Sequence, residues 1–202
     1  MRPVPHTVRS RGYLPHWEAP GATYSITFRL GDSLPQSVLD LYLRERQGIL
    51  DTAAQMQRDL TPQEHTRLAQ LFSDHIEAAL DRGMGACHLR DPRVGEMAFN
   101  AVRHFHDMRY RLETWCIMPN HVHVLLSPMG SHTLDSIVHS WKSFTSHAAN
   151  KMLARRGTFW MPEYFDHLIR DAADFAHAHR YILENPAKAG LQNWPWAATL
   201  CK

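Results

Sequence analysis

Two histidines separated by one residue lie in an apolar stretch with the pattern of a β-strand. His121 and His123 alternate with Val122, Val124 and Leu126. Strand geometry places the histidines on one face and the apolar residues on the other, so both imidazoles can bind one metal ion. A helix would instead separate residues two apart by roughly 200°. The pair therefore predicts a metal site, although a bare HxH also occurs by chance in surface strands.

A second set of polar residues has helical spacing near the end of the chain. His177, Tyr181 and Asn185 are spaced i, i+4, i+8, which puts them on one ridge of a helix. A tyrosine hydroxyl can act as a nucleophile on a target that a Lewis acid polarises, and an amide oxygen can bind a metal. The alternative is that Tyr181 is a packing aromatic and that Asn185 caps the turn at Pro186.

The elements that must position these residues follow from hydrophobic periodicity. Period-2 alternation predicts strands at 24–30, 109–118, 121–126 and 165–169. In the second strand, we expect Tyr110, Leu112 and Cys116 on the same face. Helical spacing predicts helices at 36–47, 61–83, 91–105 and 133–152, and a last helix after Asp171. We expect that helix to end by Asn185, because the residue before a proline is disfavoured in the α region.

This order of elements predicts an α+β fold of ferredoxin-like (RRM-like) type in a single domain, 1–202. A mostly antiparallel sheet would carry helices on one face and leave the other for function, with a C-terminal helix bearing Tyr181. Residues 1–20 have no periodicity and are interpreted as an N-terminal arm. Residues at about 50–85 are interpreted as a helical insertion, in which Thr61, Pro62 and Glu64 form a capping box.

Composition excludes some classes of protein and leaves others open. A formal net charge of +2 neither demands nor excludes a nucleic-acid partner. The chain has 3 cysteines and no CxxC motif, which argues against a disulfide framework or a thiolate zinc site. No apolar run approaches the roughly 18 residues of a membrane span, and no signal peptide is recognisable, so we expect a cytoplasmic protein. Phosphate-loop and dinucleotide fingerprints are absent, which predicts no nucleotide cofactor.

Several segments taken together resemble one known family. They are MPNHVHVLL (118–126), WKSFT (141–145), YFDHLIRD (164–171) and YILENPAKAGL (181–191). These segments are similar to the REP-associated tyrosine transposases, a branch of the single-tyrosine HUH transposases (IS200-like). The segment RGYLPHWEAPGATYSITFRLGDSLP (11–35) also looks like that family. The resemblance therefore covers most of the chain, apart from about 50–85.

The resemblance implies a DNA transposase that cleaves and rejoins single-stranded or hairpin (REP-like) DNA. Tyr181 would be the nucleophile and form a 5′-phosphotyrosine, while His121, His123 and Asn185 would hold Mg²⁺ or Mn²⁺. Other members of the broader superfamily place Gln where Asn185 stands, one methylene longer. The substrate would be nucleoid DNA in a bacterial cytoplasm, and the resemblance leaves both a monomer and a homodimer open.

Further residues are candidates for supporting roles. Those that could contact DNA phosphates are Arg11, Arg109, Arg111 and Lys142. Those that could support the metal ligands from behind are Asn120 and His177.

Two other functions are compatible with the same residues. A metal-dependent phosphodiester hydrolase would use the histidine pair to activate water, and it predicts cleavage without a covalent adduct. A non-catalytic single-strand nucleic-acid binder would need aromatic residues on the open face of the sheet. The first predicted strand instead places Tyr24 and Phe28 on its core face.

Overall fold

The computed structural model describes residues 7–11, 14–19 and 21–200, and a five-stranded antiparallel sheet organises this part of the chain. The strand order is β6-β3-β5-β4-β7. The strands are β3 (Tyr24–Arg29), β4 (Tyr110–Ile117), β5 (His121–Pro128), β6 (Phe165–Leu168) and β7 (Ala197–Thr199). Along the chain β3, α4, β4, β5, α5 and β6 alternate as β-α-β-β-α-β, which confirms the predicted ferredoxin-like fold.

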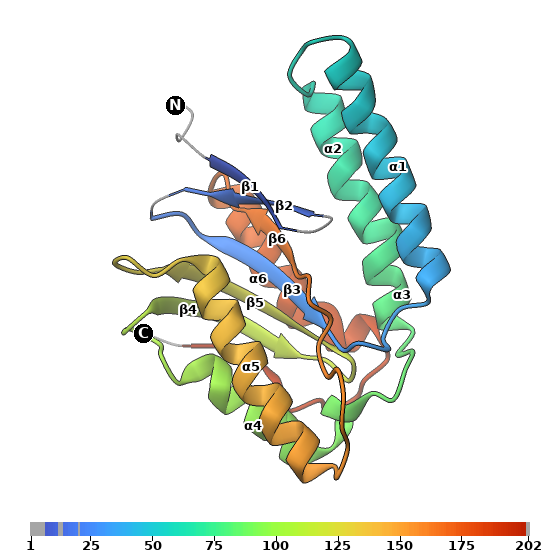
Figure 1. Ribbon diagram of the computed structural model, residues 1–202. Coiled ribbons are helices and arrows are strands. Elements are labelled where there is room, and N and C mark those ends of the chain that lie inside the picture. Colours follow the sequence, from blue (N-terminus) through green and yellow to red (C-terminus); the bar gives the residue numbers. More distant parts are fainter. Residues whose placement is uncertain (1–6, 12–13, 20, 201–202) are drawn as a thin grey trace.

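Helices lie on both faces of this sheet (Figure 1). α4 (Pro92–Arg103) and α5 (Leu134–Met152) cover one face, and α6 (Ala172–Lys188) crosses the other. Each of these helices begins with a capping side chain, because Asp91, Thr133 and Asp171 each accept a hydrogen bond from a backbone N–H in the first turn of their helix.

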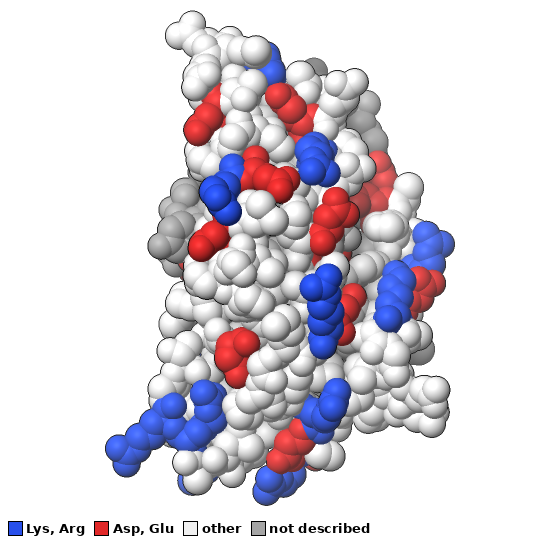
Figure 2. Space-filling view, turned by 90° about the vertical axis from the view of Figure 1, so that its right-hand side faces the viewer, with Lys and Arg blue, Asp and Glu red and all other residues white. Residues whose placement is uncertain are grey.

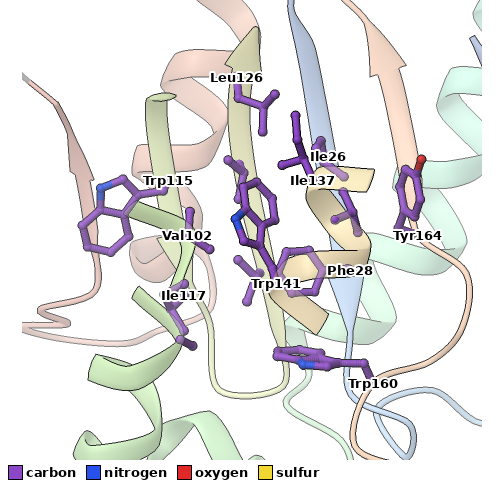
Figure 3. Packing of buried hydrophobic residues seen from close by; sticks show 14 of the residues in the cluster. Ile26, Phe28, Val102, Trp115, Ile117, Leu126, Ile137, Trp141, Trp160 and Tyr164 are labelled. Atoms are coloured by element: carbon purple, nitrogen blue, oxygen red, sulfur yellow. The ribbon is translucent and has the colours of Figure 1, made fainter. Parts of the chain in front are cut away.

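The main core lies between the sheet and the α4–α5 pair (Figure 3). Trp141 of α5 packs against Phe28 of β3, with ring centroids 6.1 Å apart. Its indole N–H donates to the Tyr110 hydroxyl at 2.9 Å, so the polar end of this large side chain is also satisfied.

A β-bulge in β4 changes which residues face this core. The pairing of β4 with β5 shifts between Leu112 and Thr114, so Glu113 is the extra residue. Leu112 faces the main core, whereas Cys116 packs on the opposite face beneath α6. The prediction that Cys116 shares a face with Leu112 was therefore wrong. A bulge inserts one unpaired residue, which strict alternation cannot reveal.

Helix α6 also differs from its predicted end. It continues through Pro186 to Lys188, where the sequence predicted an end by Asn185. Proline removes one backbone donor in the last turn. The following N–H groups still close the helix, because Ala189 N donates to Asn185 O at 3.0 Å and Leu191 N donates to Pro186 O at 2.8 Å. Asn185 is thus held inside the helix and does not end it.

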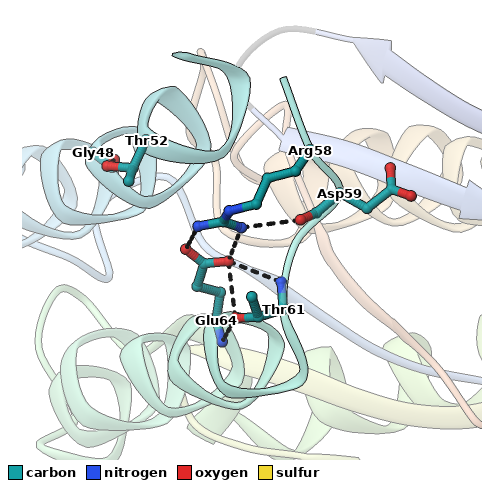
Figure 4. Close-up of polar contacts among 6 residues, drawn as sticks. All are labelled: Gly48, Thr52, Arg58, Asp59, Thr61 and Glu64. Atoms are coloured by element: carbon teal, nitrogen blue, oxygen red, sulfur yellow. Dashed lines mark hydrogen bonds and ion pairs between the residues drawn. The ribbon is translucent and has the colours of Figure 1, made fainter. Parts of the chain in front are cut away.

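A helical hairpin projects beyond the sheet and begins before the predicted insertion (Figure 1). Its elements are α1 (Gln36–Gln55), α2 (Pro62–Leu71), the π-helical turn η1 (Phe72–Glu77) and α3 (Ala78–Asp81). The predicted capping box is present (Figure 4): Glu64 N donates to Thr61 Oγ1 at 3.2 Å, and Thr61 N donates to Glu64 Oε2 at 2.8 Å. Arg58 adds a 2.7 Å ion pair to the same carboxylate.

The remaining elements are short. β1 (Thr7–Arg11) and β2 (Leu14–Glu18) pair as an antiparallel hairpin within the segment interpreted as an arm. The 3₁₀ helix η2 (His88–Arg90) joins the helical hairpin to α4. Within the described residues, no helix combines the length and the apolar character needed to cross a membrane.

Candidate functional site

The two predicted histidines face each other on the side of the sheet that α6 covers. His121 Nε2 and His123 Nε2 are 2.9 Å apart, and the side chains are 0% and 1% exposed. Two atoms that bind one ion at about 2.1 Å and at a right angle to each other lie about 3 Å apart. The observed separation therefore fits two ligands of a single metal ion.

Asn120 fixes the tautomer of His121. The Asn120 amide nitrogen donates to Leu80 O at 3.1 Å and to Met84 O at 3.0 Å, which turns its oxygen toward His121 Nδ1 at 2.7 Å. An amide oxygen only accepts, so Nδ1 carries the proton and Nε2 keeps its lone pair. Burial, and then the neighbouring His123, lower the pKa of His121 well below its usual value. The imidazole is therefore neutral and suited to binding a metal.

Strand β3 supports the second histidine in the same way. Thr27 Oγ1 lies 2.8 Å from His123 Nδ1 and can accept its proton, which leaves the Nε2 lone pair directed at the site. Burial lowers the pKa of His123 to about 3. Both rings are thus neutral near pH 7, and each is oriented by a partner on its far nitrogen.

Asn185 completes this group from helix α6. It is 0% exposed, and its amide nitrogen lies 3.2 Å from His123 Nε2. Its oxygen has no hydrogen-bond partner among the described residues, which is unfavourable for a buried carbonyl. Rotating the amide by 180° would direct the oxygen at the histidine pair, where a metal ion would satisfy it. The described residues contain no cluster of three or more His, Cys, Asp or Glu that could hold a metal, so the third ligand here would be an amide.

Tyr181 stands one turn before Asn185 and contacts the same histidine. Its ring meets the His123 ring edge to face, with centroids 5.5 Å apart, and Lys188 Nζ lies 4.9 Å from its centroid. The hydroxyl is buried and forms no hydrogen bond of ordinary geometry with a described residue. Burial, followed by Glu77 and Asp81, raises the pKa of Tyr181 far above its usual value. The resting side chain is therefore a neutral phenol that needs a proton acceptor to react.

Glu77 and Asp81 come from the helical hairpin, and the sequence did not predict a role for them. Glu77 ends η1 and Asp81 ends α3. Burial, and then Glu77, raise the pKa of Asp81 to about 6. Their i, i+4 spacing was visible in the sequence as two acids on one helical face. Nothing in the pattern indicated that this end of the hairpin folds back against α6.

The other predicted residue of α6 lies apart from this cluster. His177 is exposed, one turn before Tyr181. The structure thus brings together His121, His123 and Asn185 with Tyr181, and it places Asn120 behind them, but it leaves His177 on the surface.

The predicted DNA-contacting residues are not gathered around the histidines. Arg109 stacks on the Phe105 ring at 3.6 Å, and Arg111 pairs with Glu113 at 2.6 Å. These two arginines lie at the end of β4 that pairs with Pro128, away from His121.

Lys142 is also separate from the histidine pair. Lys142 lies on α5, on the core side of the sheet, where its ammonium donates to Pro162 O at 2.6 Å. Burial is the main reason that the pKa of Lys142 is lowered to about 8. Arg11 ends β1, and its side chain lies outside the described residues.

An HxH pair on a central strand, faced by a tyrosine and an amide on a helix, lies within a segment that matches a transposase family. The family model described as IS200-like transposase matches residues 94–185, which include both histidines, Tyr181 and Asn185. Among curated proteins the chain is similar to the REP-associated tyrosine transposase of Escherichia coli (strain K12), at 27% identity over 96 residues. It is also similar to a putative REP-associated tyrosine transposase of Haemophilus influenzae, at 29% identity over 97 residues.

These alignments cover 45% and 41% of this chain, and the chain spans about half the length of the curated relatives it matches (55% of each). A solved structure described as a REP-associated tyrosine transposase bound to a REP hairpin has the same fold. Its TM-score is 0.51 at 18% identity, over 94% of this chain and 80% of that one. The resemblance to REP-associated tyrosine transposases, predicted from sequence motifs, is confirmed by these comparisons.

Proposed function

We propose that the chain is a single-tyrosine DNA transposase that cuts and rejoins single-stranded hairpin DNA through a 5′-phosphotyrosine. The observation that carries the proposal is the convergence of His121 Nε2, His123 Nε2 and the Asn185 amide beside Tyr181. A divalent ion, Mg²⁺ or Mn²⁺, bound by those three side chains would supply Lewis-acid polarisation of a phosphate oxygen.

The tyrosine would carry out the bond exchange. Tyr181 Oη attacks the phosphorus of the scissile diester, the P–O3′ bond breaks, and the DNA 5′ end becomes attached to the tyrosine. The proton of the phenol is lost, and the leaving 3′-oxygen gains one, so the net products are a phosphotyrosine and a 3′-hydroxyl. Attack by a 3′-hydroxyl reverses the step and rejoins a strand. One phosphoester replaces another, so no nucleotide cofactor is needed.

Two acidic residues of the helical hairpin would accept the proton that the Tyr181 phenol loses. Glu77 and Asp81 are the carboxylates that raise the pKa of Tyr181, which identifies them as its acidic neighbours. A carboxyl whose pKa is about 6 can accept a proton near neutral pH and release it again to water. In this proposal the hairpin contributes part of the active site.

Hairpin DNA is the proposed substrate because a solved structure of the same fold is described as bound to a REP hairpin. The face of the molecule that Figure 2 shows carries no continuous track of one charge along the helical hairpin. On the face that Figure 2 shows, acidic and basic side chains are interspersed along the helical hairpin, where Arg67 pairs with Glu45 and Asp74. Recognition of DNA shape and of unpaired bases would then matter more than bulk charge.

The test uses an end-labelled single-stranded hairpin oligonucleotide with Mn²⁺ or Mg²⁺. We expect a labelled protein adduct that survives SDS, forms only with the metal and is absent in Tyr181→Phe. Cleavage by the wild type without any adduct would instead indicate a hydrolase. Binding without cleavage under all metal conditions would indicate a non-catalytic nucleic-acid binder.

A further inference from the structure

Arg29 is a buried cation on the same sheet face as the histidine pair. It ends β3, where its direct partner in the register is His121, just as Thr27 is the partner of His123. Directly opposed residues of antiparallel strands have Cα atoms about 4.5–5.5 Å apart and project to the same side. Only 4% of Arg29 is exposed. The base of its side chain therefore lies immediately beside the proposed metal ligands.

The partners of Arg29 do not balance its charge. Its side chain forms one hydrogen bond to a described residue, from Nη1 to the neutral Ser33 hydroxyl at 3.4 Å. Burial lowers the pKa of Arg29 to about 10, and no carboxylate among the described residues counteracts that effect. A guanidinium remains charged even so. Buried charges in proteins are normally paired, because an unpaired one costs several kcal/mol of desolvation.

The other N–H groups of the guanidinium have no hydrogen-bond partner among the described residues, and 4% of Arg29 is exposed. Arg29 therefore carries a planar fork of donors of which the described residues use one. Such a fork matches two oxygens of one phosphate, a group that a guanidinium binds more strongly than it binds neutral acceptors.

We propose that Arg29 binds a backbone phosphate of the nucleic-acid strand beside the His121–His123 pair, and so holds that strand for attack by Tyr181. This inference rests on the proposed function for the identity of the anion. It adds a residue outside the segment 94–185 that the family model matches. The ligand supplies the charge that the described residues leave unpaired, so the cost of burying Arg29 is recovered when the substrate is bound.

The first test measures binding without chemistry. A fluorescent hairpin oligonucleotide is titrated in EDTA, at several salt concentrations, with Tyr181→Phe as the parent. Adding Arg29→Gln should weaken binding about tenfold and reduce the slope of log affinity against log salt by about 0.7, the value for one phosphate contact on a single strand. The matched control is Arg93→Gln, which removes the same charge from a side chain that pairs with Asp91 at the start of α4. It should leave both quantities unchanged.

The second test uses the wild-type tyrosine and the rate of adduct formation with Mn²⁺. Arg29→Lys keeps the charge but not the fork, and we expect about a tenfold lower kcat/KM with the thermal midpoint retained. If Arg29→Gln binds with wild-type affinity and slope, the inference is overturned. Should that variant not fold, a wild-type adduct rate in Arg29→Lys overturns it instead. Failure of the proposed function is distinguishable, because binding would then depend on Arg29 while the wild type forms no adduct.

Discussion

The same strands place different kinds of side chain on the two faces of the sheet. On the face under α4 and α5, the buried residues are almost all apolar and pack as one large cluster. On the face under α6, a small apolar cluster surrounds buried polar side chains. The buried polar side chains that β3 and β5 place on this face are those of Thr27, Arg29, His121 and His123. Alternation along each strand thus places Phe28 in a dry core and its neighbours Thr27 and Arg29 in a polar site.

This difference indicates that the two faces contribute differently to stability. Apolar burial favours folding by roughly 25 cal/mol per Å². Buried polar groups contribute little net stability even when they are satisfied, and they cost free energy when they are not. The Asn185 oxygen and the charge of Arg29, which have no balancing partner among the described residues, are such costs. The α4–α5 face therefore stabilises a fold whose α6 face is arranged for function.

The largest effect is expected from the core face. Trp141→Ala removes a side chain that stacks on Phe28 and donates to Tyr110, and it should lower the free energy of unfolding by about 3–5 kcal/mol. Urea denaturation measures this loss. Phe144 is the matched control, because it is an aromatic residue on the same helix with 60% exposure, and Phe144→Ala should stay within about 0.5 kcal/mol. Equal losses in the two variants would contradict the assignment of this face as the core.

A smaller change in the free energy of unfolding, with the opposite sign, is expected when Asp81 is replaced. Its pKa is about 6 in the folded chain and 3.8 in the reference state, so the folded chain binds the proton more tightly. The ionised carboxyl therefore destabilises the fold fully above about pH 6, and not at all well below pH 4. Asp81→Asn should raise stability at pH 8 by about 1 kcal/mol, after allowing for solvent screening.

The same variant separates stability from function. Thermal unfolding of Asp81→Asn and of the wild type should differ at pH 8 and coincide at pH 3. The rate of adduct formation should fall at pH 8, because the variant removes the proton acceptor proposed for Tyr181. A variant that is more stable and fully active would exclude Asp81 from the reaction, and one that is less stable would contradict the cost assigned to its charge.

The smallest effect is expected far from both faces, at the capping box of the helical hairpin. Thr61→Ala should destabilise α2 by about 0.5–1 kcal/mol, because the Glu64 N–H loses its acceptor (Figure 4). Hydrogen exchange of the α2 amides measures it. Thr66→Ala is the control, since Thr66 Oγ1 donates to Pro62 O on the exposed side of the same helix.

The stability that the capping box gives the hairpin should also depend on pH. Arg58 is the main cause that lowers the pKa of Glu64 from 4.5 to about 2. The carboxylate therefore stabilises the hairpin above about pH 4.5, and this contribution is lost as the pH falls toward 2. Hydrogen exchange of the α2 amides, corrected for the intrinsic rate, should therefore be faster at pH 3 than at pH 6. Equal corrected rates would mean that the Glu64 carboxylate contributes nothing to the stability of the hairpin.

Local pattern predicted the strand, the histidine pair and the ridge of Tyr181 and Asn185, because periodicity fixes which side chains share a face. It could not predict the bulge at Glu113, which adds one residue without changing the composition of the strand. Nor could it predict that α6 passes through Pro186, where a single lost hydrogen bond is outweighed by packing. Glu77, Asp81 and Arg29 were missed because their roles depend on contacts between distant segments and on the lack of a partner, which no local pattern records.

We propose that the polar face of the sheet is a strand-transfer site with Tyr181 as its nucleophile. The most direct measurement is mass spectrometry of the proteolysed adduct formed with a hairpin oligonucleotide and Mn²⁺. We expect a single nucleotide-modified peptide from α6, with the phosphate on Tyr181, and none when His123 is replaced by Ala. A modified peptide from any other segment, or an adduct of equal yield in His123→Ala, would contradict it.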